Sequence, residues 1–129
     1  MHIPDEITET LINSKIIYFA GRNNGVAEEL TLKANEITRK KSDFLEGTYV
    51  FHGIEEVMNT DEVVVIIGPF KNEEEKYKNV LIKGIGLKVV ATSTRKTIFP
   101  TIIIPEYGDF TNYIEIAAGW NLLVEVGIN

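Results

Sequence analysis

The chain has 129 residues, which suits a single domain, and its 44% of apolar residues predicts a globular fold rather than a disordered one. Its 19 acidic and 13 basic residues leave a net charge of -6, and the longest basic run is Arg39–Lys41. This balance argues against nucleic acids and anionic membranes as partners. Cysteine is absent, so disulfides, thiolate metal ligands and cysteine nucleophiles are excluded. No apolar stretch approaches the roughly 18 residues of a membrane span, and the polar start at Met1–Glu6 is unlike a signal peptide, so we expect a cytoplasmic protein.

Short apolar runs alternate along the chain with longer amphipathic segments. In chain order, the pattern predicts a helix over 4–13, a strand over 16–20, a helix over 26–41, a short strand over 43–45, a strand over 63–67, a helix over 72–84, strands over 87–91 and 101–104, and a helix over 111–125. Val63–Ile67 is apolar on both faces, as a central parallel strand should be. Asn72 is a candidate helix cap, followed by Glu73–Glu75 in a first turn that we expect to be solvated.

This alternation predicts a three-layer α/β/α domain with a mostly parallel five-stranded sheet. We expect one domain over 1–129, with a leading helix in 1–13 and an α/β core in 14–129. Ligands of such sheets lie beyond the carboxyl ends of the strands, which here are the loops at Gly21, 47–53, Gly68 and 91–95.

Three groups of residues are candidates for chemistry. The Gly21–Gly25 loop precedes a helix, so its backbone N–H groups could hold a phosphate or a sugar hydroxyl, with Gly21, Arg22 and Asn23 as binding residues; a simple tight turn is an equal alternative. Glu29, Lys33 and Glu36 share one helix face and could line a cleft, although an ordinary surface pair is the favoured interpretation from spacing alone. His52 is the internal histidine, able to titrate near neutrality, but a lone histidine is more often structural and makes a poor metal site. Thr92–Arg95 could hold an anion, but a polar loop is favoured there.

Considered together, these residues resemble a known family. Phe19–Arg22, Ala27–Thr38 and Phe51–Gly53, at their spacing, look like the second sugar isomerase (SIS) domain of glucosamine-6-phosphate synthase and related sugar-phosphate deaminases and fructosamine-phosphate deglycases. Members of that family read GRG, then ALEGALKLKEIS, then HGP. The resemblance covers about 14–129 and implies a flavodoxin-like SIS fold.

The resemblance implies roles for individual residues. Glu36 corresponds to the carboxylate that moves a proton between C1 and C2 of an open-chain sugar phosphate. Lys33 and Glu29 match residues of the same pocket, and His52 matches a histidine associated with ring opening across a dimer interface. The family needs no metal and no organic cofactor.

The chain also departs from the family pattern. Tyr49 and Ile54 stand where the family has an acidic residue and a proline, and Asn35 stands where it often has lysine. The phosphate-binding Ser/Thr loop of the family lies in a first SIS domain, so the resemblance implies half a site.

The leading hypothesis is therefore half of an isomerase or deaminase site for fructose 6-phosphate or glucosamine 6-phosphate, completed by another SIS domain or a homodimer partner. One alternative is a non-catalytic sugar-phosphate sensor. Another is a domain serving only assembly, with the apolar helix near Trp120 as a dimer face.

Overall fold

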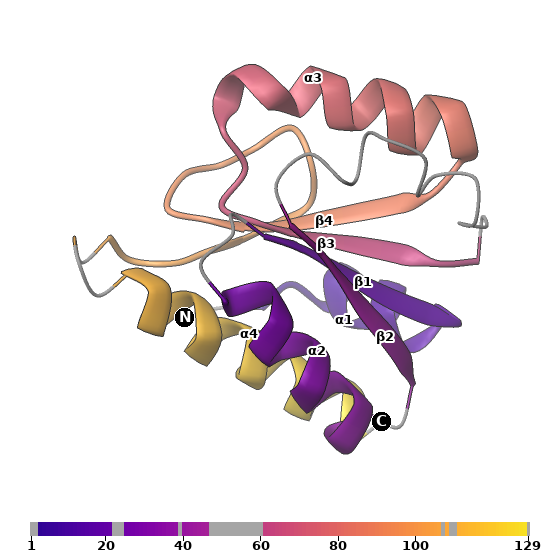
Figure 1. Ribbon diagram of the computed structural model, residues 1–129, viewed down its shortest axis with the longest axis vertical. Helices are drawn as coiled ribbons and strands as arrows, with labels where there is room; N and C mark the ends of the chain where they lie inside the picture. Colours follow the sequence, from indigo (N-terminus) through magenta and orange to yellow (C-terminus); the bar gives the residue numbers. More distant parts are fainter. Residues whose placement is uncertain are drawn as a thin grey trace.

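In the computed structural model, which describes residues 3–21, 25–38, 40–46, 61–106, 108 and 111–128, a sheet lies between two layers of helices (Figure 1). The strands are β1 (Ile16–Gly21), β2 (Lys41–Glu46), β3 (Val63–Ile67), β4 (Lys88–Ser93) and β5 (Thr101–Ile103). The helical segments are α1 (Asp5–Ile12), α2 (Val26–Ile37), the 3-10 turn η3 (Lys71–Glu73), α3 (Glu74–Tyr77), the π-helical η4 (Lys78–Ile85) and α4 (Thr111–Gly127). The predicted three-layer α/β/α architecture is confirmed.

The five strands pair in the order β2-β1-β3-β4-β5, and every pair is parallel. Val63–Ile67 is the central strand and is buried along its whole length, as its apolar run predicted. The strand order reverses between β1 and β3, which is where open α/β sheets form a crevice for ligands. Gly21 ends β1 and Gly68 follows β3 at this point.

Side-chain alternation along the strands builds a separate hydrophobic core on each face of the sheet. One face is covered by α1, α2 and α4, and the other by α3 and η4 (Figure 1). The first core includes Leu11, Phe19, Leu30, Val65, Ile102 and Leu122. The second core includes Tyr18, Ile66, Tyr77, Leu81, Val89 and Phe99.

Helix α2 is shorter than predicted, because it ends at Ile37 instead of continuing to Lys41. Lys41 instead begins β2, where it pairs with Ile16 of β1. The backbone N–H and the hydroxyl of Thr38 both donate to the Ala34 carbonyl, which closes the last turn. Strand pairing thus outweighs the helical spacing of the sequence in this stretch.

The helix expected over 72–84 is less regular than predicted. It begins with a 3-10 turn, Asn72 lies inside this turn instead of capping it, and the helix ends in the π-helical η4. Glu73–Glu75 is not uniformly solvated either, since Glu74 is only 4% exposed. Within the described ranges, no helix is long and apolar enough to cross a membrane.

Candidate functional site

Helix α2 brings Glu29, Lys33 and Glu36 to one flank, as the spacing of these residues predicted. Lys33 Nζ lies 3.7 Å from Glu36 Oε2, with the two side chains 35% and 68% exposed. This separation and exposure describe a loose surface ion pair rather than a fixed one. Both groups are accessible to a ligand or to a partner.

Helix α4 packs beside α2 and places an aromatic ring next to this pair. The helices approach closely at Gly119, where a methyl group would lie 2.6 Å from Leu30 Cδ1. Trp120 of α4 holds its ring centroid 5.8 Å from Lys33 Nζ, within the range of a cation–π interaction. The sequence predicted an apolar helix near Trp120 but carried no signal that this ring meets Lys33.

Several large apolar side chains remain exposed on α2, on α4 and just beyond α4. They are Leu32, Ile37, Tyr113, Trp120, Val124 and Ile128. Tyr113, Trp120 and Val124 recur at helical spacing, so they form one outward stripe. We define the α2–α4 face by the residues Glu29, Lys33, Glu36, Ile37, Trp120 and Val124. This face combines charged groups with uncovered apolar surface.

The Glu36 end of the α2–α4 face lies away from the carboxyl ends of the strands. Glu36 is ten residues after Val26, so it stands roughly 15 Å along the helix axis from the end of α2 that follows β1. Gly21 is buried at the end of β1, and Gly25 begins α2 with φ +85°, which favours glycine and fits the tight-turn interpretation. Three predicted site residues, Arg22, Asn23 and His52, lie outside the described residues.

A cavity of about 290 Å³ opens at the carboxyl ends of β3, β4 and β5, beside the first turns of α4. Its described lining is Gly68, Ser93, Thr94, Ile104, Glu106, Gly108, Thr111, Asn112 and Glu115. The sequence predicted ligand sites at the Gly68 and 91–95 loops, so these two walls were expected. The contribution of α4 was not.

Glu115 is the lining residue that sequence reasoning missed most clearly. It is 4% exposed, although it carries a carboxylate. The signal was present, because Glu115 shares the helical spacing of the buried residues Ala118 and Leu122. An acidic residue on the buried stripe of a helix is a site candidate. Among the described residues, no cluster of three metal-ligating side chains occurs.

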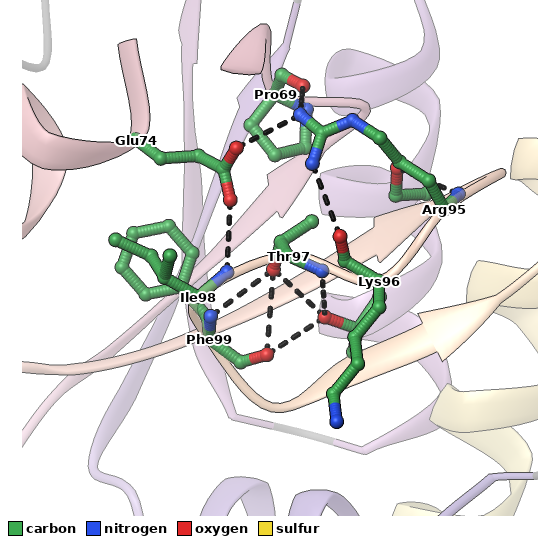
Figure 2. Close-up of polar contacts among 9 residues, drawn as sticks. Pro69, Glu74, Arg95, Lys96, Thr97, Ile98 and Phe99 are labelled. Carbon is green, nitrogen blue, oxygen red and sulfur yellow. Dashed lines mark hydrogen bonds and ion pairs between the residues drawn. The ribbon is translucent and has the colours of Figure 1, made fainter. Parts of the chain in front are cut away.

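An ion pair fixes the loop between β4 and β5 (Figure 2). Arg95 Nη2 lies 2.9 Å from Glu74 Oε2 and donates to the Pro69 carbonyl at 3.1 Å, while Nη1 donates to the Lys96 carbonyl. Glu74 Oε1 accepts the Ile98 N–H at 2.8 Å. The anion-binding alternative for Thr92–Arg95 is therefore not supported at Arg95, whose guanidinium already serves this clamp.

The clamp continues into the cavity wall and into the loop itself. The Arg95 N–H donates to Ser93 Oγ at 3.3 Å, and Ser93 lines the cavity. Further along, the hydroxyls of Thr97 and Thr101 lie 2.7 Å apart and both donate to the Phe99 carbonyl (Figure 2). Several hydrogen bonds thus determine the course of this loop.

A second buried polar pair lies in the core under α3. Tyr18 is 7% exposed and Glu62 is 1% exposed. Burial raises the pKa of Tyr18 to about 12, and the hydrogen bond to Glu62 and the charges of Glu62 and Asp43 act in the same direction. The phenol is therefore neutral at physiological pH, and its hydrogen bond to Glu62 serves stability.

Comparison with known proteins shows which solved structures share this fold. No protein-family model and no curated protein matches the sequence. Over 96% of the chain, the fold matches 38% of the C-terminal domain of glucosamine-fructose-6-phosphate aminotransferase from Francisella tularensis, with a TM-score of 0.73 and 19% identity. Over 94% of this chain, the fold matches 38% of tagatose-6-phosphate ketose/aldose isomerase from Escherichia coli, with a TM-score of 0.69 and 17% identity.

A third solved structure with a similar fold belongs to a transcription factor. The fold covers 79% of the sugar isomerase domain of the RpiR transcription factor from Sphaerobacter thermophilus, over 98% of this chain, with a TM-score of 0.68 and 11% identity. The chain has the SIS fold. At these identities the likeness is one of fold, which confirms the fold implied by the sequence resemblance. The chain spans about two fifths of the length of the aminotransferase domain and the isomerase.

Proposed function

We propose that this chain supplies one half of an active site that isomerises or deaminates a phosphorylated sugar, of the fructose 6-phosphate or glucosamine 6-phosphate type. The SIS fold supports this substrate class, since its neighbours include enzymes named for fructose 6-phosphate and tagatose 6-phosphate. In this proposal Glu36 is the base that moves a proton between C1 and C2. Lys33 and Glu29 line the same site.

The observation that carries the proposal is the accessible Lys33–Glu36 pair on the α2–α4 face. A carboxylate within reach of C1 and C2 can remove and return one proton, as isomerisation through an enediol requires. An ammonium group beside it would stabilise the negative charge that develops on the enediolate oxygen. Lys33 and Glu36 have the right chemistry for these two tasks, and their separation of 3.7 Å supports assigning both tasks to one place.

The exposure of Glu36 supports a need for a partner. Proton transfer from carbon is favoured in a site from which water is excluded, whereas Glu36 is 68% exposed. The apolar side chains Ile37, Trp120 and Val124 share the α2–α4 face with Glu36 and are themselves exposed. Another SIS domain or a second copy of this chain, seated on the α2–α4 face, would bury both groups at once. We propose that this partner also supplies the phosphate-binding loop.

His52 keeps the role that the resemblance implies, and the loop after β1 keeps the role that its place before a helix suggested. Arg22 and Asn23, with Gly21, are proposed to contact the substrate. His52 is proposed to assist ring opening. The protein would act without a metal or an organic cofactor, in the cytoplasm, as a single domain over 1–129.

The test is proton exchange with solvent. The chain is co-expressed with the product of the neighbouring reading frame, or studied as its own dimer, and incubated with fructose 6-phosphate or glucosamine 6-phosphate in deuterated water. Proton NMR follows deuterium entering C1 and C2. We expect Glu36→Gln to slow exchange by about 10²–10⁴-fold, the usual contribution of a positioned base. Glu28→Gln, an exposed neighbour on α2 outside the α2–α4 face, is the matched control. Full exchange by Glu36→Gln would remove Glu36 as the base.

A non-catalytic sensor is the second candidate, because the SIS fold also occurs in the RpiR transcription factor. Calorimetry with hexose 6-phosphates separates the two candidates. Binding without deuterium exchange, in the presence of the partner domain, would favour the sensor. Light scattering tests the third interpretation, a purely structural assembly domain, which a monomer at micromolar concentration would contradict.

A further inference from the structure

Two close contacts fix helix α4 beside helix α2 (Figure 1). A methyl group at Gly119 would lie 2.6 Å from Leu30 Cδ1, and a methyl group at Gly127 would lie 3.0 Å from the Ile37 carbonyl oxygen. Leu30 is 1% exposed, so a larger residue at position 119 would force the core to rearrange. Because the two contacts follow the same order along both helices, α2 and α4 run parallel in a fixed register.

This register determines which side chain of α4 meets the charged flank of α2. Trp120 directly follows Gly119, and Lys33 comes three residues, just under one helical turn, after Leu30. The close approach of Gly119 to Leu30 therefore brings Trp120 and Lys33 together as well. The centroid of the Trp120 ring lies 5.8 Å from Lys33 Nζ. Backbone packing thus places the ring within reach of the ammonium group.

The ring and the carboxylate of Glu36 act on Lys33 in different ways. Glu36 Oε2 lies 3.7 Å from Lys33 Nζ, which is longer than a hydrogen bond. Lys33 Nζ lies over the Trp120 ring, and a ring attracts a cation through its face without accepting a directed hydrogen bond. The ammonium can therefore be held in place while its N–H donors remain available to an oxygen of the substrate.

We infer that Trp120 is a positioning residue for Lys33, and that its ring holds the ammonium beside Glu36, where negative charge develops on the enediolate oxygen. This role rests on the half-site proposed at Glu36, and it adds a side chain of α4 to a site otherwise built on α2. Trp120 acts through Lys33 and not on the reacting atoms.

The exposure of the ring links this hold on Lys33 to the presence of a partner. Trp120 is 42% exposed and the Lys33 side chain is 35% exposed in the isolated chain. A cation–π interaction is weak in water and strengthens as water is excluded. A partner seated on the α2–α4 face would therefore tighten the hold on Lys33 at the same time as it buries Glu36. Binding of the partner and assembly of the site then become one event.

The first test measures deuterium exchange by the partnered protein with Trp120→Leu and Trp120→Phe. Leucine removes the aromatic ring, so we expect the maximal rate to fall about tenfold, the effect of losing one desolvated cation–π interaction. The half-saturating substrate concentration should change less than about twofold, because the ring serves the transition state and not substrate binding. Phenylalanine restores a ring and should keep about a third of the rate or more. Tyr113→Leu removes a 70% exposed ring elsewhere on α4 and is the matched control.

The second test needs no substrate and uses the isolated chain. Protons that lie over an aromatic ring are displaced upfield in proton NMR by its ring current. We expect such a displacement for the ε-methylene protons of Lys33, relative to those of the exposed Lys15. The displacement should disappear in Trp120→Leu and persist in Trp120→Phe. It should increase when the partner is added.

The positioning role is overturned if Trp120→Leu exchanges deuterium like the wild type while Glu36→Gln does not. It is equally overturned if the Lys33 protons show no displacement, or if Trp120→Phe is as slow as Trp120→Leu. Full exchange by Glu36→Gln together with displaced Lys33 protons would instead overturn the proposed base and leave the contact of ring and ammonium standing. The two failures are therefore distinguishable.

Discussion

Two ion pairs in this molecule each join a basic side chain to a glutamate, but in opposite settings. Lys33 and Glu36 lie 3.7 Å apart on one turn of α2, with Glu36 68% exposed. Arg95 and Glu74 lie 2.9 Å apart across 21 residues of chain, with the Glu74 side chain 5% exposed. The second glutamate also accepts a backbone N–H from Ile98. One pair is loose and open to partners, and the other is fixed by several contacts.

The difference indicates which charges are available for function. An exposed pair one turn apart contributes only a few tenths of a kcal/mol, so Lys33 and Glu36 can change partners at little cost. The clamp of Glu74 and Arg95 fixes a loop whose Ser93 lines the cavity, and separating the pair would leave a carboxylate buried. The clamp therefore serves the shape of a site, and the loose pair is suited to take part in one.

The largest effect on stability should come from Glu74→Ala. We expect it to lower the free energy of unfolding by about 2–3 kcal/mol, below the usual cost of breaking a fully buried pair because Arg95 is 37% exposed. The loss combines the ion pair with the acceptor for the Ile98 N–H. Urea denaturation followed by circular dichroism measures it. Glu75→Ala, at the exposed neighbouring position, should cost less than about 0.5 kcal/mol. Equal costs for the two variants would show that the clamp is no more than a surface contact.

Much of the fold could be predicted from the sequence, because strand-length apolar runs and helical spacing are local signals. The strand Val63–Ile67 and the start of α4 at Thr111 were predicted correctly for this reason. The predicted end of α2 was wrong, because the pairing of Lys41 with Ile16 is a contact between residues that are far apart in the sequence. The burial of Glu74 was missed for the same reason, since it depends on a loop more than twenty residues away.

The candidate site likewise has parts that the sequence predicted and parts that it did not. The shared flank of Glu29, Lys33 and Glu36 follows from helical geometry alone, and the sequence predicted it. The ring of Trp120 beside Lys33 depends on how α4 packs against α2, which helical spacing does not specify. For the cavity, the sequence predicted the strand-end walls, because strand ends are local features. It did not predict the wall that contains Glu115, because that wall depends on how α4 packs against the sheet.

Tyr18→Phe should have the next largest effect on stability. The hydroxyl of Tyr18 donates to Glu62, and both residues are buried, so its loss should cost about 1–2 kcal/mol by leaving that carboxylate with one donor fewer. Thermal unfolding at neutral pH measures this cost. Tyr113→Phe is the control, since its ring is 70% exposed and should contribute little.

The same residue predicts a dependence on alkaline pH. The pKa of Tyr18 is about 12 in the folded protein, against about 10 in an unfolded chain. A raised pKa means that the stabilisation is fully present below pH 10 and is lost as the pH rises through 12. The stability difference between wild type and Tyr18→Phe should therefore shrink over this interval. A difference that stays constant from pH 9 to 12 would contradict the buried hydrogen bond.

The smallest effect on stability should come from Lys33→Met, which tests the loose side of the comparison. Methionine keeps an unbranched apolar stem beside Trp120 and removes the charge, so only the exposed ion pair and the cation–π contact are lost. We expect the free energy of unfolding to change by less than about 0.5 kcal/mol, in 0.1 M and in 0.5 M salt alike. The same variant should slow the deuterium exchange of the partnered protein, because the ammonium is proposed to stabilise the enediolate. A loss of 2 kcal/mol or more in the isolated chain would instead make Lys33 a structural residue like Arg95. Unchanged stability together with slower deuterium exchange in Lys33→Met would thus show that the charge of Lys33 serves function and not the fold.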